Sequence, residues 1–305
     1  MATLDKPMAS AKDWLEGARL RTLPAAAAPV LVGGGAAFNL GAFSIGKSLL
    51  ALGVALALQI GVNLANDYSD GIRGTDQDRV GPTRLTASGL VPARQVLAFA
   101  LSTFGVAGVL GLALIAWSGH WWMVAVGLAS VGAAWFYTGG SRPYGYMGVG
   151  LSELFVFVFF GLVATVGTTY VQTTNLPWWV WCAASGIGLI SVALLMVNNI
   201  RDIPTDSQVG KNTLAVRLGD GASRVAYMVM IVGGLLLGAV ALAGAGSTYW
   251  WLFAAALLLA GLPGAVTIAK GAKGLALLGS LRNTGLYALA YGVLVGAGLA
   301  LSSAI

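Results

Sequence analysis

The sequence predicts an all-α integral membrane protein, built as a bundle of about nine transmembrane helices. Of its 305 residues, 57% are hydrophobic and only 9% are charged, whereas soluble domains carry about 25% charged residues. Nine apolar segments each come close to the roughly 20 residues that a helix needs to cross the hydrocarbon core. Because so few charges cannot cover the surface of a soluble protein, the bilayer is the expected solvent.

The nine segments are expected to form a single transmembrane domain, residues 22–305, after an N-terminal tail of residues 1–21. The tail carries both signs of charge and lacks the apolar stretch of a cleavable signal peptide. The 44 glycines suit close approach of helices in lipid. The predicted segments are 22–43, 48–66, 95–117, 121–139, 147–170, 177–199, 222–245, 248–269 and 284–304.

The positions of the charges predict the orientation. If the N-terminus is cytoplasmic, all 17 Lys and Arg residues except Lys47 lie on the cytoplasmic side, in or beside the tail and four connections. The positive-inside rule then places the C-terminus outside. The 11 acidic residues share this bias, with Glu153 a little way into the fifth segment, although acids contribute little to orientation. The acidic bias therefore indicates a chemical site on the cytoplasmic face. The four connections are 67–94, 140–146, 200–221 and 270–283.

A first polar cluster closes the second segment. Its side chains are spaced by four, three and four residues, which places them on one face of a helix. A polar stripe on a membrane helix must face the bundle interior or a wet cavity, because exposure to lipid is costly. Further acids follow at Asp67, Asp76 and Asp78. The residues of the stripe are Gln59, Asn63, Asn66 and Asp70.

A second cluster closes the sixth segment, where Asn198, Asp202 and Asp206 again step by four. Its Asn198-x-x-x-Asp202 step matches Asn66-x-x-x-Asp70 in the first cluster. The two clusters lie four segments apart, and an even number of crossings returns the chain to the same face. We therefore expect both clusters to contribute to one site, with a pair of solvated mixed-charge loops as the alternative interpretation.

Several carboxylates in one place repel one another unless a cation joins them. Asp and Asn oxygens favour Mg²⁺ or Ca²⁺, and Mg²⁺ commonly completes its coordination with water and substrate phosphate. Neighbouring Arg and Lys side chains suit the remaining phosphate oxygens. The clusters thus predict a magnesium-dependent diphosphate site. The candidate metal ligands are Asn66, Asp67, Asp70, Asp76, Asn198, Asp202 and Asp206, and the candidate diphosphate-binding residues are Asn63, Arg79, Arg84, Arg142, Lys211 and Arg217.

The run NDYSDGIRGTD at 66–76 resembles the first aspartate-rich motif of the UbiA-type intramembrane prenyltransferases, and NNIRDIPTD at 198–206 resembles the second. RTLPAAAAPVLVG at 21–33, RVGPTRLTASG at 79–89, YTGGSRPYGY at 137–146, ELFVFVFFG at 153–161 and GKNTLAVRLGD at 210–220 resemble the branch that prenylates 1,4-dihydroxy-2-naphthoate in menaquinone synthesis. The resemblance extends from about residue 14 to the end. The superfamily often places a third acid where this chain has Gly74, and here that acid is Asp76.

The resemblance implies transfer of a polyprenyl group from its diphosphate to the naphthoate, with loss of CO₂. It also implies that Asp70 and Asp202 are catalytic residues. It also implies the cytoplasmic membrane of a bacterium. Glu153 is the one acid within a predicted segment, so it is a candidate to orient or deprotonate the acceptor hydroxyl. An equally weighted alternative is that Glu153 is a buried structural acid that pairs with Arg142 or Tyr137. The ring faces of Tyr137, Tyr144 and Tyr146 are candidates to shield an allylic cation.

Three further interpretations follow from the residues. Phe155, Phe157, Phe159 and Phe160 fall all round an α-helix, so they are expected to face lipid or pack between helices. The net charge of +6 reflects membrane orientation, and no nucleic-acid partner is expected. The alternatives to a prenyltransferase are another aromatic acceptor for the same chemistry, a CDP-alcohol phosphotransferase suggested by DYSDGIR, and a secondary transporter suggested by the repeated clusters.

Overall fold

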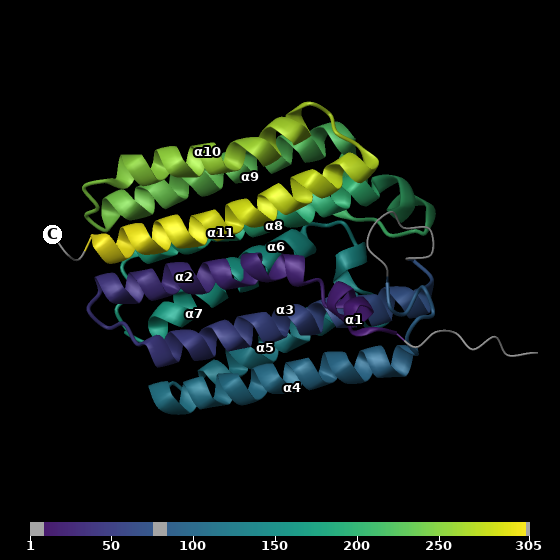
Figure 1. Ribbon diagram of the computed structural model, residues 1–305, viewed down its shortest axis with the longest axis horizontal. Helices are drawn as coiled ribbons and strands as arrows, with labels where there is room; N and C mark the ends of the chain where they lie inside the picture. Colours follow the sequence, from purple (N-terminus) through teal and green to yellow (C-terminus); the bar gives the residue numbers. More distant parts are fainter. Residues whose placement is uncertain (1–8, 76–83, 303–305) are drawn as a thin grey trace, which may run out of the picture.

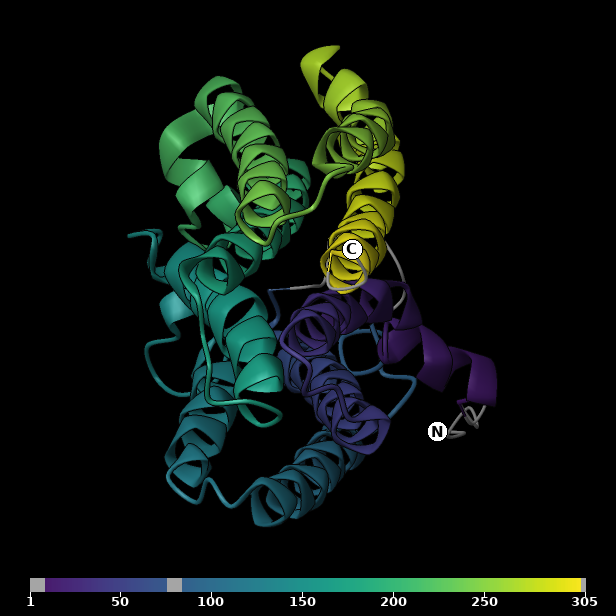
Figure 2. The same cartoon turned by 90° about the vertical axis from the view of Figure 1, so that its left-hand side faces the viewer.

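The computed structural model of the protein describes residues 9–75 and 84–302. Within these two ranges the chain is helical and contains no strand. The long helices run side by side along the length of the molecule (Figure 1). Helices α9 and α10 form one edge of the bundle and α4 the opposite edge, as the view at right angles also shows (Figure 2). The predicted all-α membrane architecture is confirmed.

Each of the nine predicted segments contains helix in the described part of the chain. Within residues 9–75 and 84–302, seven helical stretches are long and apolar enough to cross a membrane, while α2 has 17 residues and α5 has 14. The count of nine crossings and the orientation stay predictions. The elements are α1 Ala11–Gly17, η1 Leu20–Thr22, α2 Leu23–Asn39, α3 Ile45–Arg73, α4 Ala93–Ser118, α5 Met123–Phe136, η2 Tyr144–Tyr146, α6 Leu151–Val156, η3 Phe157–Val163, α7 Ala164–Tyr170, α8 Trp178–Gln208, α9 Leu214–Gly244, α10 Trp250–Ala269, η4 Gly274–Ala276 and α11 Leu277–Leu301.

The two helices that carry the polar clusters extend well beyond their apolar stretches. Helix α3 runs to Arg73, where Gly74 adopts a left-handed conformation (φ 73°) and ends it. Helix α8 runs to Gln208. Both helices therefore extend into the predicted connections 67–94 and 200–221, in agreement with the four-residue steps of their polar residues. Both acidic clusters consequently lie on rigid helical turns.

Helix α8 lies in the centre of the larger core. It packs against α9, α11 and η3, while α2 packs against α11 and α3 packs against α4. Ile187, Ile190 and Met196 of α8 and Tyr291 of α11 are fully buried in this core. Tyr291 donates a hydrogen bond to the Ala183 carbonyl of α8, 3.0 Å away. The core therefore fixes the position of α8, and with it the second acidic cluster.

Glycine allows the closest approaches between helices. A Cβ atom on Gly35 of α2 would lie 2.1 Å from the carbonyl oxygen of Gly296 on α11. Gly161 of η3 and Gly188 of α8 meet in the same way, since a Cβ on Gly161 would lie 2.6 Å from the Gly188 Cα. Both contacts are backbone against backbone, so neither neighbour can rotate away. These positions confirm the role expected for glycine in this bundle.

Substitution of Gly35 with alanine tests this contact. We expect Gly35→Ala to separate α2 from α11 and to destabilise the protein by about 1–3 kcal/mol, the usual cost of overpacking. Thermal unfolding in detergent would measure the loss. Gly105→Ala is the matched control, because a Cβ there meets nothing within 4 Å, and equal unfolding temperatures for the two variants would contradict the proposed contact.

Candidate active site

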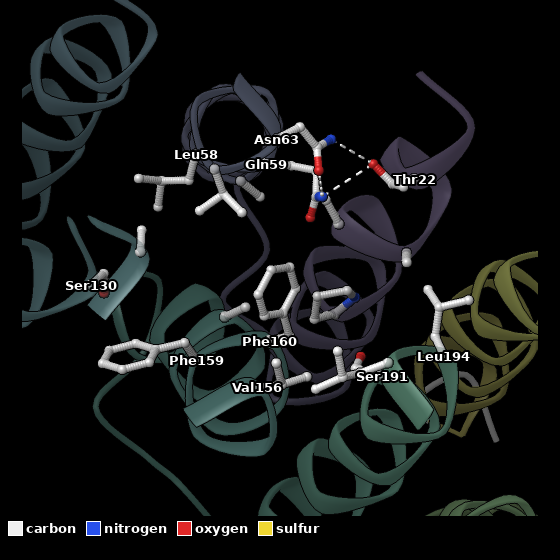
Figure 3. Close-up of a pocket in the computed structure, with 18 of the residues that line it drawn as sticks. Thr22, Leu58, Gln59, Asn63, Ser130, Val156, Phe159, Phe160, Ser191 and Leu194 are labelled. Atoms are coloured by element: carbon white, nitrogen blue, oxygen red, sulfur yellow. Dashed lines mark hydrogen bonds between the residues drawn. The ribbon is translucent and has the colours of Figure 1, made fainter. Parts of the chain in front are cut away.

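A cavity of about 820 Å³ lies inside the bundle, bounded by α2, α3, α5, the α6–α7 stretch, α8 and α11. Figure 3 shows part of its wall. The side chains that α3 contributes change along the helix from apolar (Ala51, Val54, Leu58) to polar toward its C-terminal end. The cavity therefore has an apolar part and a polar end, and residues of both clusters, namely Asn66, Asp70 and Asn198, line the polar end.

The polar stripe of α3 faces this cavity. Gln59, Asn63, Asn66 and Asp70 all line it and are at most 8% exposed. The Asn66 side-chain oxygen accepts a hydrogen bond from Thr138 at 2.7 Å. This contact helps to hold the stripe in place. The stripe faces the cavity, as its helical spacing predicted.

The second cluster lies on the last turns of α8. Asn198 lines the cavity, whereas Asp202 and Asp206 lie outside its lining and are only 2% and 5% exposed. Arg201 donates to both carboxylate oxygens of Asp202, at 2.6 and 2.7 Å, and to the Asn198 side-chain oxygen at 2.9 Å. Lys211 lies 3.5 Å from Asp206. The acids of this cluster are therefore each accompanied by a cation.

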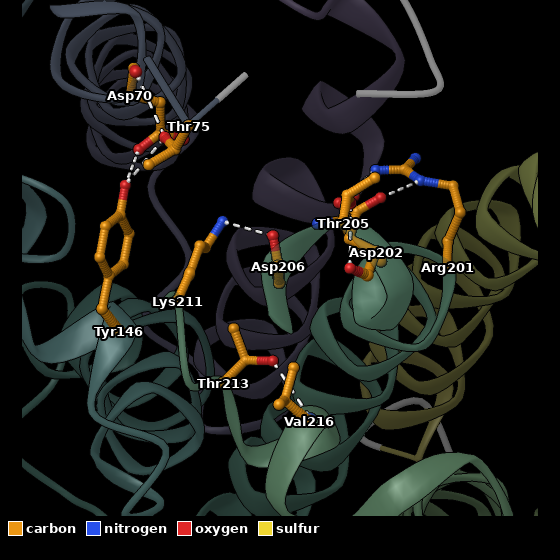
Figure 4. Close-up of polar contacts among 11 residues, drawn as sticks. Asp70, Thr75, Tyr146, Arg201, Asp202, Thr205, Asp206, Lys211, Thr213 and Val216 are labelled. Atoms are coloured by element: carbon orange, nitrogen blue, oxygen red, sulfur yellow. Dashed lines mark hydrogen bonds and ion pairs between the residues drawn. The ribbon is translucent and has the colours of Figure 1, made fainter. Parts of the chain in front are cut away.

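Tyr146 of η2 connects the two clusters (Figure 4). Its hydroxyl donates to Asp70 Oδ1 at 2.5 Å, and the Lys211 ammonium lies 5.2 Å from its ring centroid. The Arg73 guanidinium lies 5.7 Å from the same centroid. Burial, followed by the Asp70 charge, raises the pKa of Tyr146. Since a raised pKa favours the protonated form, the hydroxyl remains a donor to Asp70 through the neutral and mildly alkaline range.

Asp67 makes structural contacts that its sequence position did not predict. Its carboxylate accepts hydrogen bonds from the backbone amides of Leu85 and Thr86, at 2.9 and 2.8 Å, and the side chain is fully buried. It does not line the cavity. The carboxylate thereby holds the backbone of Leu85 and Thr86 against α3, and its assignment as a metal ligand stays a prediction.

The predicted cations are placed differently from one another. Arg84 is 9% exposed and lines the cavity, as does Lys211. Arg142 and Arg217 are exposed and outside the cavity lining. Asp76, Asp78 and Arg79 lie outside the described residues. Arg19, Arg21 and Arg282 also line the cavity. Sequence reasoning missed these three as site residues, because a basic residue at a membrane edge is ordinarily explained by orientation.

Glu153 is buried at 8% exposure but does not line the cavity. Neither carboxyl oxygen has a hydrogen-bond partner among the residues that the structure describes. The alternative interpretation, in which Glu153 pairs with Arg142 or Tyr137, is therefore not supported by a hydrogen bond to either residue. Tyr137 and Tyr144 both line the cavity, with their rings 5.5 Å apart in an edge-to-face arrangement.

Three phenylalanines line the cavity, contrary to the expectation that they face lipid or pack between helices. Residues 157–163 form a π-helix, which is bonded i→i+5 and turns less per residue than an α-helix. This geometry brings Phe160 toward the side on which Phe155 and Phe159 already lie. Phe157 instead packs against Gly188. The expectation was wrong because it assumed α-helical periodicity.

The donor set suits a hard divalent cation without enclosing one. Asp70, Asn66 and Asn198 place carboxylate and amide oxygens in the lining of the polar end. Asp202 and Asp206 add buried carboxylates four and eight residues after Asn198 on the same helix. Among the described residues, no group of three or more acidic, His or Cys side chains is close enough to hold an ion alone. This arrangement fits Mg²⁺, which keeps water and phosphate in its coordination sphere and takes few protein ligands.

The UbiA prenyltransferase family matches residues 26–276. The chain belongs to this family. It is 47% identical to the 1,4-dihydroxy-2-naphthoate octaprenyltransferase of Mycobacterium tuberculosis, over 96% of this chain and 98% of that protein. It is 39% identical to the enzyme of the same name from Escherichia coli, over 79% of this chain and 80% of that one. The resemblance inferred from the two aspartate motifs is confirmed.

Solved UbiA structures share this fold. A UbiA homologue from Aeropyrum pernix superposes with a TM-score of 0.67, at 17% identity over 92% of this chain and 96% of its own. A homologue from Archaeoglobus fulgidus, bound to DMAPP and Mg²⁺, gives 0.64 at 15% identity, over 93% and 99%. As a UbiA family member the chain is an integral membrane protein. Nothing in the family match supports a CDP-alcohol phosphotransferase or a transporter.

The contact between Tyr146 and Asp70 predicts how this family member responds to Mg²⁺. Groups that orient a metal ligand typically account for ten- to a hundredfold in metal affinity. We expect Tyr146→Phe to raise about tenfold the Mg²⁺ concentration that half-maximally increases the unfolding temperature in the presence of inorganic diphosphate. Tyr249→Phe is the control, since Tyr249 is 52% exposed. An unchanged Mg²⁺ dependence in Tyr146→Phe would remove Tyr146 from the site.

Proposed function

We propose that the protein transfers a polyprenyl group from polyprenyl diphosphate to 1,4-dihydroxy-2-naphthoate, releasing diphosphate and CO₂. The observation that carries the proposal is the cavity, whose lining changes from apolar to polar and ends at Asn66 and Asp70 of the first cluster and Asn198 of the second. A polyprenyl diphosphate has an apolar tail and a charged diphosphate, so its binding site needs an apolar part beside a polar part. The acceptor comes from the relatives, which are named for octaprenyl transfer to this naphthoate.

The proposed diphosphate site is the polar end of the cavity. Asp70, Asp202 and Asp206, with the amide oxygens of Asn66 and Asn198, would hold Mg²⁺, which when bound neutralises charge on the leaving diphosphate. The homologue from Archaeoglobus fulgidus binds DMAPP with Mg²⁺, which supports this use of a divalent cation. Lys211 and Arg84 line the same end and are placed to bind phosphate oxygens. Arg79 and Arg142 stay candidates for the same role, whereas the amide nitrogen of Asn63 is already directed at Ala18 and Thr22.

The reaction breaks the bond between the allylic carbon and the diphosphate oxygen. The allylic cation that forms is shielded by aromatic ring faces, for which Tyr137 and Tyr144 are placed in the cavity wall. A ring carbon of the naphthoate supplies the electron pair for the new carbon–carbon bond. Loss of the carboxylate as CO₂ returns an electron pair to the ring. The product is the quinol form of demethylmenaquinone.

The apolar part of the cavity is the proposed position of the first isoprene units. Phe155, Phe159 and Phe160 line it, together with Val30, Leu114 and Ile115. Ser130, Ser191 and Thr168 also line it, but each hydroxyl donates to a backbone carbonyl four residues earlier. The hydroxyl hydrogens are therefore directed away from a tail that cannot accept hydrogen bonds.

We place the protein in the cytoplasmic membrane of a bacterium, with the polar end of the cavity facing the cytoplasm. Lys47 supports this assignment: it is the one basic residue on the predicted outer side, and its ammonium donates to the Val171 carbonyl at 2.8 Å. The other basic residues then lie at the cytoplasmic end. A polyprenyl diphosphate in the inner leaflet would present its charged head to this end and its tail to the bilayer.

A transfer assay tests the proposed function. Protein purified in detergent, given labelled polyprenyl diphosphate, Mg²⁺ and dihydroxynaphthoate, is expected to form prenylated product, and EDTA is expected to abolish it. We expect Asp70→Asn and Asp202→Asn each to lower kcat by about a hundredfold or more, as loss of charge stabilisation at a reacting centre does.

Two results would contradict parts of this proposal. Activity that survives EDTA, or survives both substitutions together, would exclude the metal-assisted departure of diphosphate. Transfer to another aromatic acceptor but not to dihydroxynaphthoate would keep the prenyltransferase and overturn the acceptor. Asp220→Asn is a suitable control for the loss of a negative charge, because Asp220 pairs with Arg224 at the surface.

Glu153 provides a separate prediction. A buried carboxyl group without hydrogen-bond partners costs stability, and such groups are retained at functional sites. We expect Glu153→Gln to lower kcat by about a hundredfold, the usual contribution of an acid–base group, and to leave the unfolding temperature equal or higher. Single-turnover kinetics and thermal unfolding measure the two effects. A normal kcat would assign Glu153 to packing alone.

A further inference from the structure

A hydrogen-bonded network on the cavity wall joins α3 to the turn before α2. Gln59 Nε2 donates to Thr22 Oγ1 at 3.1 Å and to Asn63 Oδ1 at 3.3 Å. Asn63 Nδ2 donates to Thr22 Oγ1 and to the Ala18 carbonyl, both at 3.0 Å. Thr22 Oγ1 in turn donates to the Arg19 carbonyl at 2.9 Å. The network therefore ends on two backbone carbonyls.

These two carbonyls determine the direction of every bond in the network, because a carbonyl only accepts. The Thr22 hydroxyl hydrogen goes to Arg19, so the Thr22 oxygen can only accept from the amides. Asn63 must direct its nitrogen to Ala18, which leaves its oxygen as an acceptor. Gln59 meets two acceptors and must present its nitrogen to both. Its own carbonyl oxygen, Oε1, is then necessarily turned the other way.

Gln59 Oε1 faces the cavity. Figure 3 shows it pointing away from Thr22 and Asn63, on the side of Phe160. Gln59 is 8% exposed and lines the cavity, and no described residue donates a hydrogen bond to this oxygen. A carbonyl oxygen that is open to a largely apolar cavity is stabilised by a hydrogen-bond donor from a ligand or from water. The wall thus offers one oriented acceptor at the border between the apolar part and the polar end.

The direction of the network decides which ligand group can bind there. The prenyl tail has no polar hydrogen, and diphosphate and carboxylate are acceptors that a carbonyl oxygen would repel. Among the groups of the proposed substrates, only a ring hydroxyl is a donor. The hydroxyl beside the carboxylate of the naphthoate donates within its own molecule, whereas the 4-hydroxyl has no such partner.

We propose that Gln59 is a specificity-determining residue that accepts a hydrogen bond from the 4-hydroxyl of the aromatic acceptor. The network of Thr22 and Asn63 holds its amide in the required direction. This inference rests on the proposed function, since it assigns one contact of the proposed acceptor. Phe160 lies beside Gln59 in the same wall, where its ring can contact an aromatic substrate.

The test compares a ligand that has the 4-hydroxyl with one that lacks it. Gln59→Met keeps the side-chain length and removes the acceptor. We expect it to raise the KM for dihydroxynaphthoate on the order of ten- to a hundredfold, the effect of losing one buried hydrogen bond. The inhibition constant of 1-hydroxy-2-naphthoate and the KM for polyprenyl diphosphate are expected to stay within about twofold of wild type.

Two further variants guard against a trivial loss of folding. Thr22→Val removes one of the groups that orient the Gln59 amide, and we expect a smaller rise in the same KM with the same unchanged inhibition constant. Gln172→Met is the matched control. Gln172 does not line the cavity and accepts a hydrogen bond from the Ser44 amide at 2.7 Å. Its replacement should change neither the KM for dihydroxynaphthoate nor the inhibition constant of 1-hydroxy-2-naphthoate. Unfolding temperatures confirm that each variant is folded.

The inference is overturned if Gln59→Met weakens both aromatic ligands equally, or if it raises the KM for polyprenyl diphosphate instead. Failure of the proposed function gives a different result, namely a wild-type protein that does not prenylate dihydroxynaphthoate. If wild type uses another hydroxylated aromatic acceptor, the same comparison between that acceptor and its deoxy analogue still decides the role of Gln59.

Discussion

The rest of the structure depends on one constraint: the row of polar side chains on α3 must find hydrogen-bond partners inside a membrane bundle. An unpaired polar group in an apolar environment is costly. The stripe on α3 therefore needs partners, and they come from three distant segments. Thr22 precedes α2, Thr138 follows α5, and Tyr146 lies in η2. These contacts gather the segments around one end of the cavity, so the stripe organises the site as well as contributing to it.

The buried carboxylates of the two aspartate motifs are stabilised by different partners. Both place an acid four residues after an asparagine on a helix that ends at the same side of the bundle. Asp70 accepts a hydrogen bond from a neutral tyrosine, whereas Asp202 is held by both nitrogen donors of Arg201. Asp202 is thus already charge-compensated before any ligand binds. The two halves of the site are therefore held by different partners despite their matched sequences.

Much of this arrangement follows from local patterns in the sequence. Hydropathy places the helical segments, and steps of three and four residues place Asn63, Asn66 and Asp70 on one face. The misses have physical causes that local patterns do not contain. The partners of Asp67 are backbone amides 18 and 19 residues away. The cavity-facing position of Phe160 depends on a π-helix, and the helix ends depend on hydrogen bonding beyond the apolar stretches.

The distribution of donors along the cavity explains where the reacting bond should lie. In the apolar part, hydroxyl hydrogens are bound to helix carbonyls, so the wall is suited to a hydrocarbon chain. At the polar end, Lys211 and Arg84 supply cationic donors suited to phosphate oxygens. A polyprenyl diphosphate can match these two parts of the wall in only one orientation. Its carbon–oxygen bond then lies at the border between the apolar part and the polar end.

The aromatic residues Tyr137 and Tyr144 also line the cavity. The network at Gln59 stands on the opposite wall from α8 (Figure 3), so an acceptor held there would approach the allylic carbon from the α3 side.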